Sequence, residues 1–107
     1  MTRRNELRIT TRSEGETVVI SLHGAMTADS LNKGELEREL LKLLDLGFRR
    51  FVLDLEHIKL MHHEGIGYLV FLYTRVAQRG GEISLVNVPR KVKDILQILS
   101  IASLFEP

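Results

Sequence analysis

Leu-Met-His-His-Glu-Gly-Ile-Gly, residues 60–67, separates an apolar run at Phe51–Leu55 from an amphipathic run at Ile66–Val76. This order predicts a strand, a tight loop and the first turn of a helix. Gly65 and Gly67 keep the backbone free of side-chain bulk there, so another surface can approach closely. The first N–H groups of the helix lack partners within it and form a seat for an anionic group. We expect the rest of the chain to be a scaffold that presents this loop.

Length and composition restrict the class of protein. The 107 residues suffice for one hydrophobic core, so we expect a single domain over residues 1–107. A hydrophobic content of 44% and a formal net charge of +1 are ordinary for a globular protein and argue against binding to nucleic acid. Because the chain has no cysteine, disulfides and thiolate chemistry are excluded.

Sequence signals for membranes and for catalysis are absent as well. The sequence has no apolar stretch near the ~18 residues that span a bilayer, so we expect no direct membrane insertion. The polar start Met-Thr-Arg-Arg-Asn-Glu differs from a signal peptide, and we expect a cytoplasmic protein. The sequence contains neither a Gly-x-x-x-x-Gly-Lys phosphate loop nor a nucleophile elbow. We therefore expect no enzymatic activity and no cofactor.

Four runs predict strands. Leu7–Thr11 and Thr17–Leu22 alternate apolar and polar residues across a short turn, which predicts an antiparallel hairpin. Phe51–Leu55 is almost continuously apolar, which is typical of a central strand covered on both faces. Ile83–Val88 is the fourth run.

Three segments have the apolar spacing of helices. Leucines recur at helical spacing from Leu36 to about Asp45, and Gly47 follows at the position where a left-handed residue ends a helix. The second helix covers Ile66–Val76, and the third begins after Pro89. Candidates for the N-cap of the first helix are Asp29, Ser30 and Asn32, and Asn32 with Glu35 fits the reciprocal capping pattern.

The order of elements predicts an α/β fold. A mixed sheet of four to five strands would begin with the hairpin and continue with parallel strands, connected by three or four helices. In such sheets, sites gather at the carboxyl ends of the parallel strands. Two predicted loops lie there, at His23–Ser30 and at Glu56–Glu64.

Several short stretches, in this order and spacing, resemble the STAS domain, named for sulfate transporters and anti-sigma factor antagonists. They are Ile20-Ser-Leu-His-Gly, Phe51-Val-Leu-Asp-Leu, Met61-His-His-Glu-Gly-Ile-Gly, Gly80-Gly81 and Leu85-Val-Asn-Val. The resemblance extends from Leu7 to Phe105 and implies a STAS-like fold. The length is similar to that of the freestanding bacterial anti-sigma factor antagonists.

The resemblance also implies a regulatory site. At the residues that make up this site in the family, the chain has different residue types. Family members carry Asp-Ser-Ser/Thr-Gly-Leu-Gly, and a partner kinase, itself the anti-sigma factor, phosphorylates the first serine. His62 replaces the aspartate, His63 takes the phosphoacceptor position, and Glu64 replaces the second hydroxyl residue. The family's acidic positions after the second strand fall on Ala25 and Thr27. The usual serine switch therefore cannot operate at residues 60–67.

Two opposite consequences of the missing serine are open. Without a phosphate, the domain would be a permanent binder, which we favour. Alternatively, Glu64 would supply a fixed negative charge that resembles the phosphorylated state, although one carboxylate carries only about half the charge of a phosphate. The simpler role for Glu64 is to stabilise the helix start through the helix dipole.

The same loop suggests other chemistry. His62 and His63, with His23 and Glu64, are weak candidates for a metal site, since neighbouring residues point apart and metals need three or four ligands. Imidazole also allows a pH-responsive surface or a phosphohistidine at His63. Thr27 and Ser30 are alternative hydroxyl acceptors for phosphate, although capping is commoner for Ser30.

We therefore predict a protein-interaction module that resembles an anti-sigma factor antagonist and binds an anti-sigma factor or a related kinase-like protein. The alternatives are a STAS scaffold subunit of a lipid transporter or sensory assembly, and a domain that binds a metal or a small molecule. The oligomeric state is left open. The predicted contact residues are Met61, His62, His63, Glu64, Gly65, Ile66, Gly67, Tyr68, Thr27 and Ser30.

Overall fold

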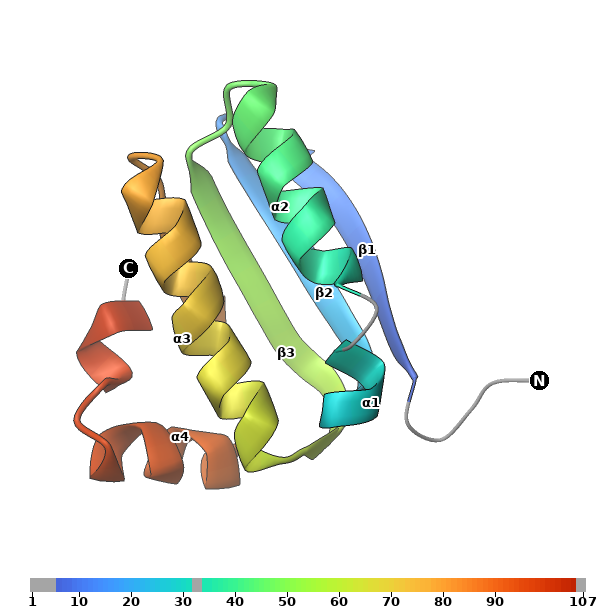
Figure 1. The fold of residues 1–107 in the computed structure, drawn as a ribbon, viewed down its shortest axis with the longest axis vertical. Coiled ribbons are helices and arrows are strands. Elements are labelled where there is room, and N and C mark those ends of the chain that lie inside the picture. The colour runs from blue at the N-terminus through green and yellow to red at the C-terminus, as the bar shows by residue number, and fades with distance from the viewer. Residues whose placement is uncertain (1–5, 32–33, 106–107) are drawn as a thin grey trace.

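The computed structural model describes residues 6–31 and 34–105, and within them a four-stranded sheet has the order β1-β2-β3-β4. Figure 1 labels β1, β2 and β3 of this sheet. β1 (Leu7–Glu14) and β2 (Thr17–Met26) form an antiparallel hairpin. β3 (Arg50–Met61) pairs with β2 in parallel, and β4 (Glu82–Val86) pairs with β3 in parallel. The predicted mixed sheet, with its N-terminal hairpin and later parallel strands, is confirmed.

Helices alternate with the later strands. α2 (Glu35–Asp45) and α3 (His63–Gln78) lie side by side over the sheet, and α4 (Arg90–Ile98) follows β4 (Figure 1). These are the three helices that the apolar spacing predicts. A one-turn helix, α1 (Ala28–Leu31), and a 3-10 turn, η1 (Ala102–Phe105), were not predicted. None of the described helices has the length and apolar character needed to cross a bilayer.

One hydrophobic core lies between the sheet and α2 and α3. Burying one leucine, isoleucine or phenylalanine side chain in such a core contributes about 1.5–3 kcal/mol to the free energy of unfolding. α4 and η1 extend the core beyond β4, where Phe105 is 3% exposed. Side chains that are at most 1% exposed include Ile20, Leu22, Leu36, Leu40, Leu53, Leu55, Leu69 and Leu72.

Within the described ranges the helices cover only one face of the sheet, so the prediction that β3 is covered on both faces is wrong. Burial alternates along β3: Phe51, Leu53 and Leu55 are buried, whereas Val52 and Asp54 are only partly buried. This alternation is expected of a strand with one covered face. Valine at position 52 made the run look continuously apolar although its side chain points away from the core.

Strands β2 and β3 continue well past their predicted ends, so the two predicted loops at His23–Ser30 and Glu56–Glu64 are wrong. His23 still pairs with His57, and Met26 pairs with Met61. Irregularities in register, between Ser21 and His23 and between Gly24 and Ala25, interrupt the strict alternation. Such β-bulges hide the strand signal in the sequence, because apolar residues no longer fall at every second position.

The start of α2 differs from the prediction, whereas its end agrees with it. Gly34 occupies the N-cap position with φ +63° and provides no side-chain oxygen. Asp29 and Ser30 belong instead to α1, and Asn32 lies outside the described residues. Gly47, with φ +103°, follows the last turn, and its N–H donates to the Leu44 carbonyl at 3.0 Å. Only glycine adopts this backbone conformation without strain.

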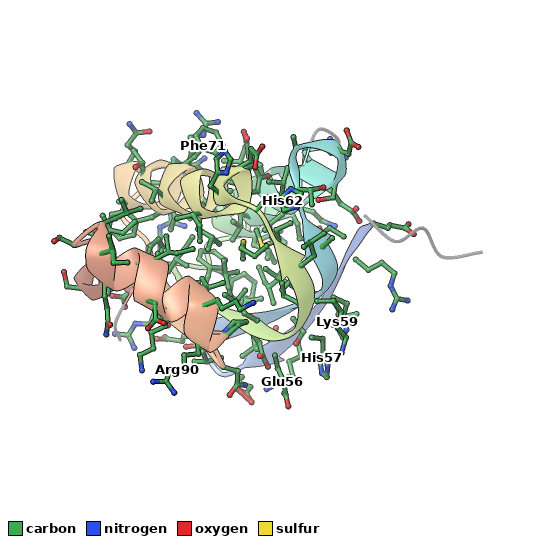
Figure 2. All side chains as sticks on the ribbon, turned by 90° about the horizontal axis from the view of Figure 1, so that it is seen from below. Glu56, His57, Lys59, His62, Phe71 and Arg90 are labelled. Atoms are coloured by element: carbon green, nitrogen blue, oxygen red, sulfur yellow. The ribbon has the colours of Figure 1, made fainter. Side chains whose placement is uncertain are left out.

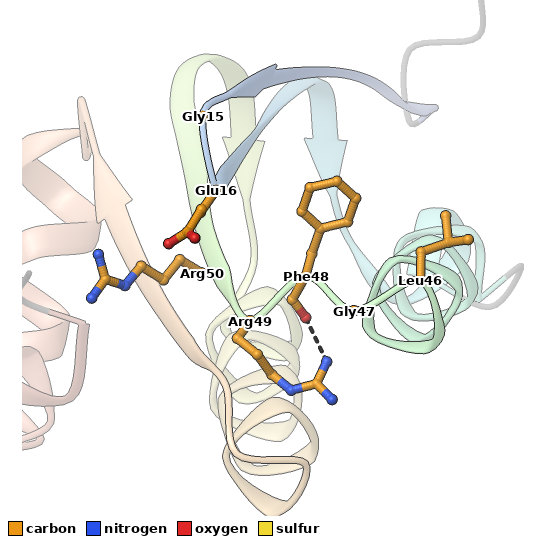
Figure 3. Close-up of a pocket in the computed structure, with 7 residues that line it drawn as sticks. All are labelled: Gly15, Glu16, Leu46, Gly47, Phe48, Arg49 and Arg50. Atoms are coloured by element: carbon orange, nitrogen blue, oxygen red, sulfur yellow. Dashed lines mark hydrogen bonds between the residues drawn. The ribbon is translucent and has the colours of Figure 1, made fainter.

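Arg49 stabilises the connection from α2 to β3, which Figure 3 draws together with the surface hollow beside it. Its Nη1 donates to the carbonyl oxygens of Leu44 at 2.9 Å and Phe48 at 2.8 Å. The first of these gives the Leu44 carbonyl, which also accepts from the Gly47 N–H, a second donor at the end of the helix. This connection precedes β3, so it lies at the opposite end of the strand from residues 60–67.

Candidate functional site

Strands β2 and β3 end side by side, and α3 begins directly after them. The N–H of His62 donates to the Met26 carbonyl at 3.1 Å, and the N–H of Gly65 donates to the His62 carbonyl at 2.8 Å. The predicted strand, tight loop and helix start are therefore present, with His62 as the single residue between β3 and α3. The hydrogen bond to Met26 fixes this corner to the end of the neighbouring strand.

The two glycines of the helix start have different surroundings. A Cβ atom added at Gly65 would lie 2.9 Å from the Cβ and carbonyl oxygen of Met26 and would overlap the Met61 sulfur. Gly65 is buried and lets α3 pack closely on the end of β2. A Cβ atom at Gly67 would meet nothing within 4 Å, and the residue is exposed. Only Gly67 leaves the backbone accessible from outside.

The side chains before these glycines point into solvent. The His63 side chain is 91% exposed and the Glu64 side chain is 42% exposed, with 3.8 Å between His63 Nε2 and Glu64 Oε2. His62 is the N-cap of α3, but its side chain makes no capping hydrogen bond. The first N–H groups of α3 are thus left without a side-chain cap, and Glu64 lies in the first turn, where the helix dipole favours a negative charge.

Thr27 and Ser30 close the neighbouring turn. The Thr27 N–H donates to Ser30 Oγ at 2.9 Å, and the Ser30 N–H donates to Thr27 Oγ1 at 3.4 Å. Ser30 Oγ also lies 2.8 Å from the Ala25 carbonyl, to which it donates. Thr27 is 5% exposed. Both hydroxyls thus act in a reciprocal cap of α1, which contacts α3.

Tyr68 joins the start of α3 to α2. Its hydroxyl accepts a hydrogen bond from the Glu37 N–H at 3.2 Å. Burial raises the pKa of Tyr68, and the Glu37 charge acts in the same direction, against the opposing effect of that hydrogen bond. The Phe71 ring, 42% exposed, lies 5.9 Å from the Tyr68 ring. Leu72, the next residue along α3, is 1% exposed and belongs to the core.

The structure separates the histidines that the metal hypothesis groups together. His23 lies opposite His57 on the open face of the sheet, where the rings stack with centroids 4.8 Å apart and planes 4° apart. Figure 2 shows His62 beside the helix layer and His57 on the opposite side of the sheet. His23 therefore cannot join His62 and His63. Among the described residues, no group of three His, Asp or Glu side chains is placed to hold a metal ion.

Asp54 is a polar residue of β3 that the sequence analysis gave no role. Its Oδ1 accepts hydrogen bonds from the Glu56 N–H at 3.0 Å and from Asn87 Nδ2 at 3.1 Å. Partial burial opposes ionisation, but these hydrogen bonds and the charges of His57 and Arg12 outweigh it and lower the pKa of Asp54. The one sign in the sequence that Asp54 has a role is its position as a carboxylate within an apolar run.

Comparison with known proteins connects this arrangement to a family. The profile described as "Mlab, STAS domain" matches residues 9–106. The chain belongs to the STAS domain family. The family assignment agrees with the STAS-like fold that the sequence resemblance implied.

Individual relatives agree with this assignment. The chain is 30% identical over 77 residues to BtrV of Bordetella bronchiseptica, a protein provisionally named an anti-sigma factor antagonist. That match covers 72% of this chain and 66% of BtrV, slightly less than two thirds of the relative's length.

Solved structures share the STAS fold at low sequence identity. The unphosphorylated form of the anti-sigma factor antagonist SpoIIAA gives a TM-score of 0.72 at 16% identity, covering 91% of this chain and 84% of SpoIIAA. The phosphorylated form gives 0.70 at 16% identity, covering 91% and 87%. The protein TM1081 gives 0.77 at 13% identity, covering 99% and 84%. The chain thus shares the fold of SpoIIAA, and the STAS-like fold that the resemblance implied is confirmed.

Proposed function

We propose that this STAS domain binds an anti-sigma factor or a related kinase-like protein through the start of α3 and the adjacent turn, without control by serine phosphorylation at residues 62–64. The observation that carries this proposal is the corner at His62–Gly67, in which His62, His63, Glu64 and Gly67 are exposed, the backbone is accessible at Gly67 and no residue has a hydroxyl group. The predicted contact residues that reach the surface are Met61, His62, His63, Glu64, Gly67 and Tyr68, with Ser30 beside them. Gly65, Ile66 and Thr27 are buried, so their predicted contact role is replaced by one in supporting this surface.

Accessibility at Gly67 supports a binding role. Glycine inside a helix lowers stability by about 1 kcal/mol relative to alanine. Nothing within the described part of the chain requires a glycine at this position, since a Cβ atom would meet no neighbour within 4 Å. A partner surface that lies against the helix backbone would explain why this position is a glycine. Phe71, one turn further along α3 and 42% exposed, offers that partner an apolar contact.

The hydroxyl groups near the corner support the absence of serine-type control. His63 stands at the position where the family has its phosphoacceptor. In the neighbouring turn, Thr27 is 5% exposed and Ser30 Oγ is hydrogen-bonded to Ala25 O, so a kinase would have to disrupt α1 to modify either. We therefore favour a domain that binds permanently over one that a phosphate switches off.

Calorimetric titration against the kinase-type anti-sigma factors of the source organism tests the proposal. We expect one of them to bind the wild-type chain and to lose at least about tenfold in affinity with Gly67→Arg, because the long side chain keeps the surfaces apart. Ala77→Arg, at another exposed position of α3, is the matched control and should bind normally. Binding that Gly67→Arg leaves unchanged would remove this corner from the interface.

Two further measurements concern regulation. After incubation with ATP and the bound kinase, mass spectrometry should find no phosphate on the peptide that contains His63. Glu64→Gln distinguishes the two roles of Glu64: an unchanged affinity fits a permanent binder, whereas a tighter complex would show that this carboxylate acts as a fixed negative charge. Phosphate on Thr27 or Ser30 would contradict the proposal of a permanently active domain.

A further inference from the structure

β1 forms an edge of the sheet, and within the described ranges its only strand neighbour is β2. It pairs with β2 over eight residues, Leu7–Glu14, without any shift in register. Natural edge strands are usually protected from pairing with another chain by proline, lysine, a bulge or short length. β1 has no proline, lysine or bulge and is eight residues long. Its protection is limited to the charged side chains Arg8, Arg12 and Glu14, which favour a strand of complementary charge.

The hydrogen bond from the Ala25 N–H to the Glu6 carbonyl, at 3.1 Å, determines which backbone groups of β1 are available. In an antiparallel ladder, residues that exchange hydrogen bonds with the partner strand alternate with residues whose N–H and C=O point away from it. Because the Glu6 carbonyl bonds to β2, the backbone N–H and C=O groups of Arg8, Thr10 and Arg12 also point toward β2. The outward-facing backbone groups belong to Leu7, Ile9, Thr11 and Ser13.

We propose that β1 pairs antiparallel with β1 of a second copy of this chain, with Thr11 opposite Thr11 of the other copy. A two-fold axis through this pair makes the two contacts identical, as in most homodimers. The Ile9 and Ser13 backbones then face each other and exchange hydrogen bonds. The two sheets join into one, and a surface made of four strands becomes a surface made of eight.

Charge complementarity selects this register. With Thr11 on the axis, Arg8 of each copy lies opposite Glu14 of the other, and opposite charges at such positions stabilise a strand pair. Moving the two-fold axis from Thr11 to Thr10 places Arg8 of each copy opposite Arg12 of the other. Moving it to Arg12 places the two Arg12 residues opposite each other. Each of these alternatives brings like charges together within β1, whereas the proposed register pairs opposite charges there.

The single chain leaves these charges available. Arg12 Nε lies 3.4 Å from Glu14 Oε1 along the same strand, but the two side chains are 60% and 56% exposed, and exposed pairs of this kind are weak. Glu14 can therefore turn to Arg8 of the other copy at little cost. The corner at His62–Gly67 follows β3 rather than β1, so dimer formation leaves it accessible and does not depend on the proposed function.

Sedimentation velocity of the full chain over a range of concentrations tests this proposal. We expect a reversible dimer whose dissociation constant rises about tenfold with Arg8→Glu or with Glu14→Arg, since each change introduces two like-charge contacts. The double variant Arg8→Glu/Glu14→Arg restores opposite charges across the axis and should recover wild-type affinity. A wild-type chain that stays monomeric near 1 mM, or a dimer that neither single reversal weakens, would overturn the proposal.

Hydrogen exchange on the wild-type chain gives a readout that does not depend on how the variants fold. The amides of Ile9, Thr11 and Ser13 should exchange at least about tenfold more slowly at a concentration that favours the dimer than at a low one. The amides of Arg8, Thr10 and Arg12 already bond to β2 and should show little change. Equal exchange of the outward-facing amides at both concentrations would exclude pairing through this edge.

Discussion

Gly65 and Gly67 illustrate how much the surroundings of a single residue matter, because the same residue type has opposite roles two positions apart. Gly65 packs against Met26 and Met61, whereas Gly67 faces open space. From the sequence, both glycines are predicted to allow close approach by another surface. The structure divides that role: Gly65 allows close packing within the chain, and Gly67 leaves the helix backbone accessible from outside.

Alanine substitutions at the two glycines should therefore change stability in opposite directions. Gly67→Ala should raise the free energy of unfolding by about 0.5–1 kcal/mol, because alanine has the better helix propensity and meets no neighbour. Gly65→Ala should lower it by roughly 1–3 kcal/mol, because its Cβ forces Met26 and Met61 apart. Urea unfolding of the two variants beside the wild type measures both values. A stabilising Gly65→Ala would contradict the close packing of α3 on β2.

Asp54 gives a prediction about pH. Its pKa in the folded chain is lowered from the ordinary value of 3.8, so folding favours the charged form. The resulting stabilisation is complete above the pKa of the unfolded state and is lost as pH falls through the lower pKa of the folded state. The stability difference between wild type and Asp54→Asn should thus be largest above about pH 5 and should shrink below about pH 4. Urea titrations at several pH values measure this difference, and a constant value would contradict the assignment.

Among the elements, α2 and α3 are joined by polar contacts at both of their ends. Gly34 caps α2 without a side-chain oxygen, and Tyr68 of α3 accepts from the Glu37 N–H in its first turn. Glu37 also lies 3.5 Å from Arg75, and Asp45 lies 2.8 Å from Arg79. These contacts align the two helices over the core and hold the start of α3 in place.

Tyr68→Phe should therefore destabilise the chain by about 1 kcal/mol, because it removes the acceptor for a backbone N–H of α2. Tyr73→Phe is a matched control on the same helix, where the ring packs edge-on against Phe105 and keeps that contact after substitution. The pKa of Tyr68 is raised in the folded state, so its contribution is present below about pH 10 and is lost as pH rises through the folded value. Thermal unfolding at pH 7 compares the two variants, and an equal loss in both would contradict the role of the Tyr68 hydroxyl.

Helix positions were predictable from the sequence, because apolar spacing records directly which side of a helix is buried. The three main helices and the left-handed Gly47 after α2 were found in this way. Strand ends were not, because the bulges in β3 break the alternation that marks a strand. The N-cap of α2 was missed because Gly34 acts through its backbone conformation, which leaves no hydrogen-bonding side chain to recognise.

The candidate site was only partly predictable for a related reason. The exposed corner at residues 62–67 follows from a strand, a break and a helix, and the structure agrees with that prediction. Grouping His23 with His62 failed because the side chains of a strand alternate between two faces, and the face of His23 depends on the register of β2. That register could not be read from the sequence, since β2 extends four residues beyond its predicted end at Leu22.

In the molecule as a whole, one face of the sheet is covered by helices and buried, and the other face is open. The helix-covered face supplies the core, with Leu53 at 0% exposed. The open face carries charged and polar residues that pair across neighbouring strands. Arg50 Nε lies 3.2 Å from Glu82 Oε1, and the His23 and His57 rings stack. Stability and binding are thus separated: the core stabilises the fold, while the sheet edge and the corner at residues 62–67 remain available for contacts.

Adjacent positions on β3 test this division of the molecule. Leu53→Ala removes a fully buried side chain from the core and should lower the free energy of unfolding by about 2–5 kcal/mol. Val52→Ala changes the next residue, which points to the open face and is only partly buried, and should cost about 1 kcal/mol or less. Chemical denaturation with circular dichroism measures both. Similar losses at the two positions would mean that another layer covers the open face, as a dimer joined through β1 alone would not do.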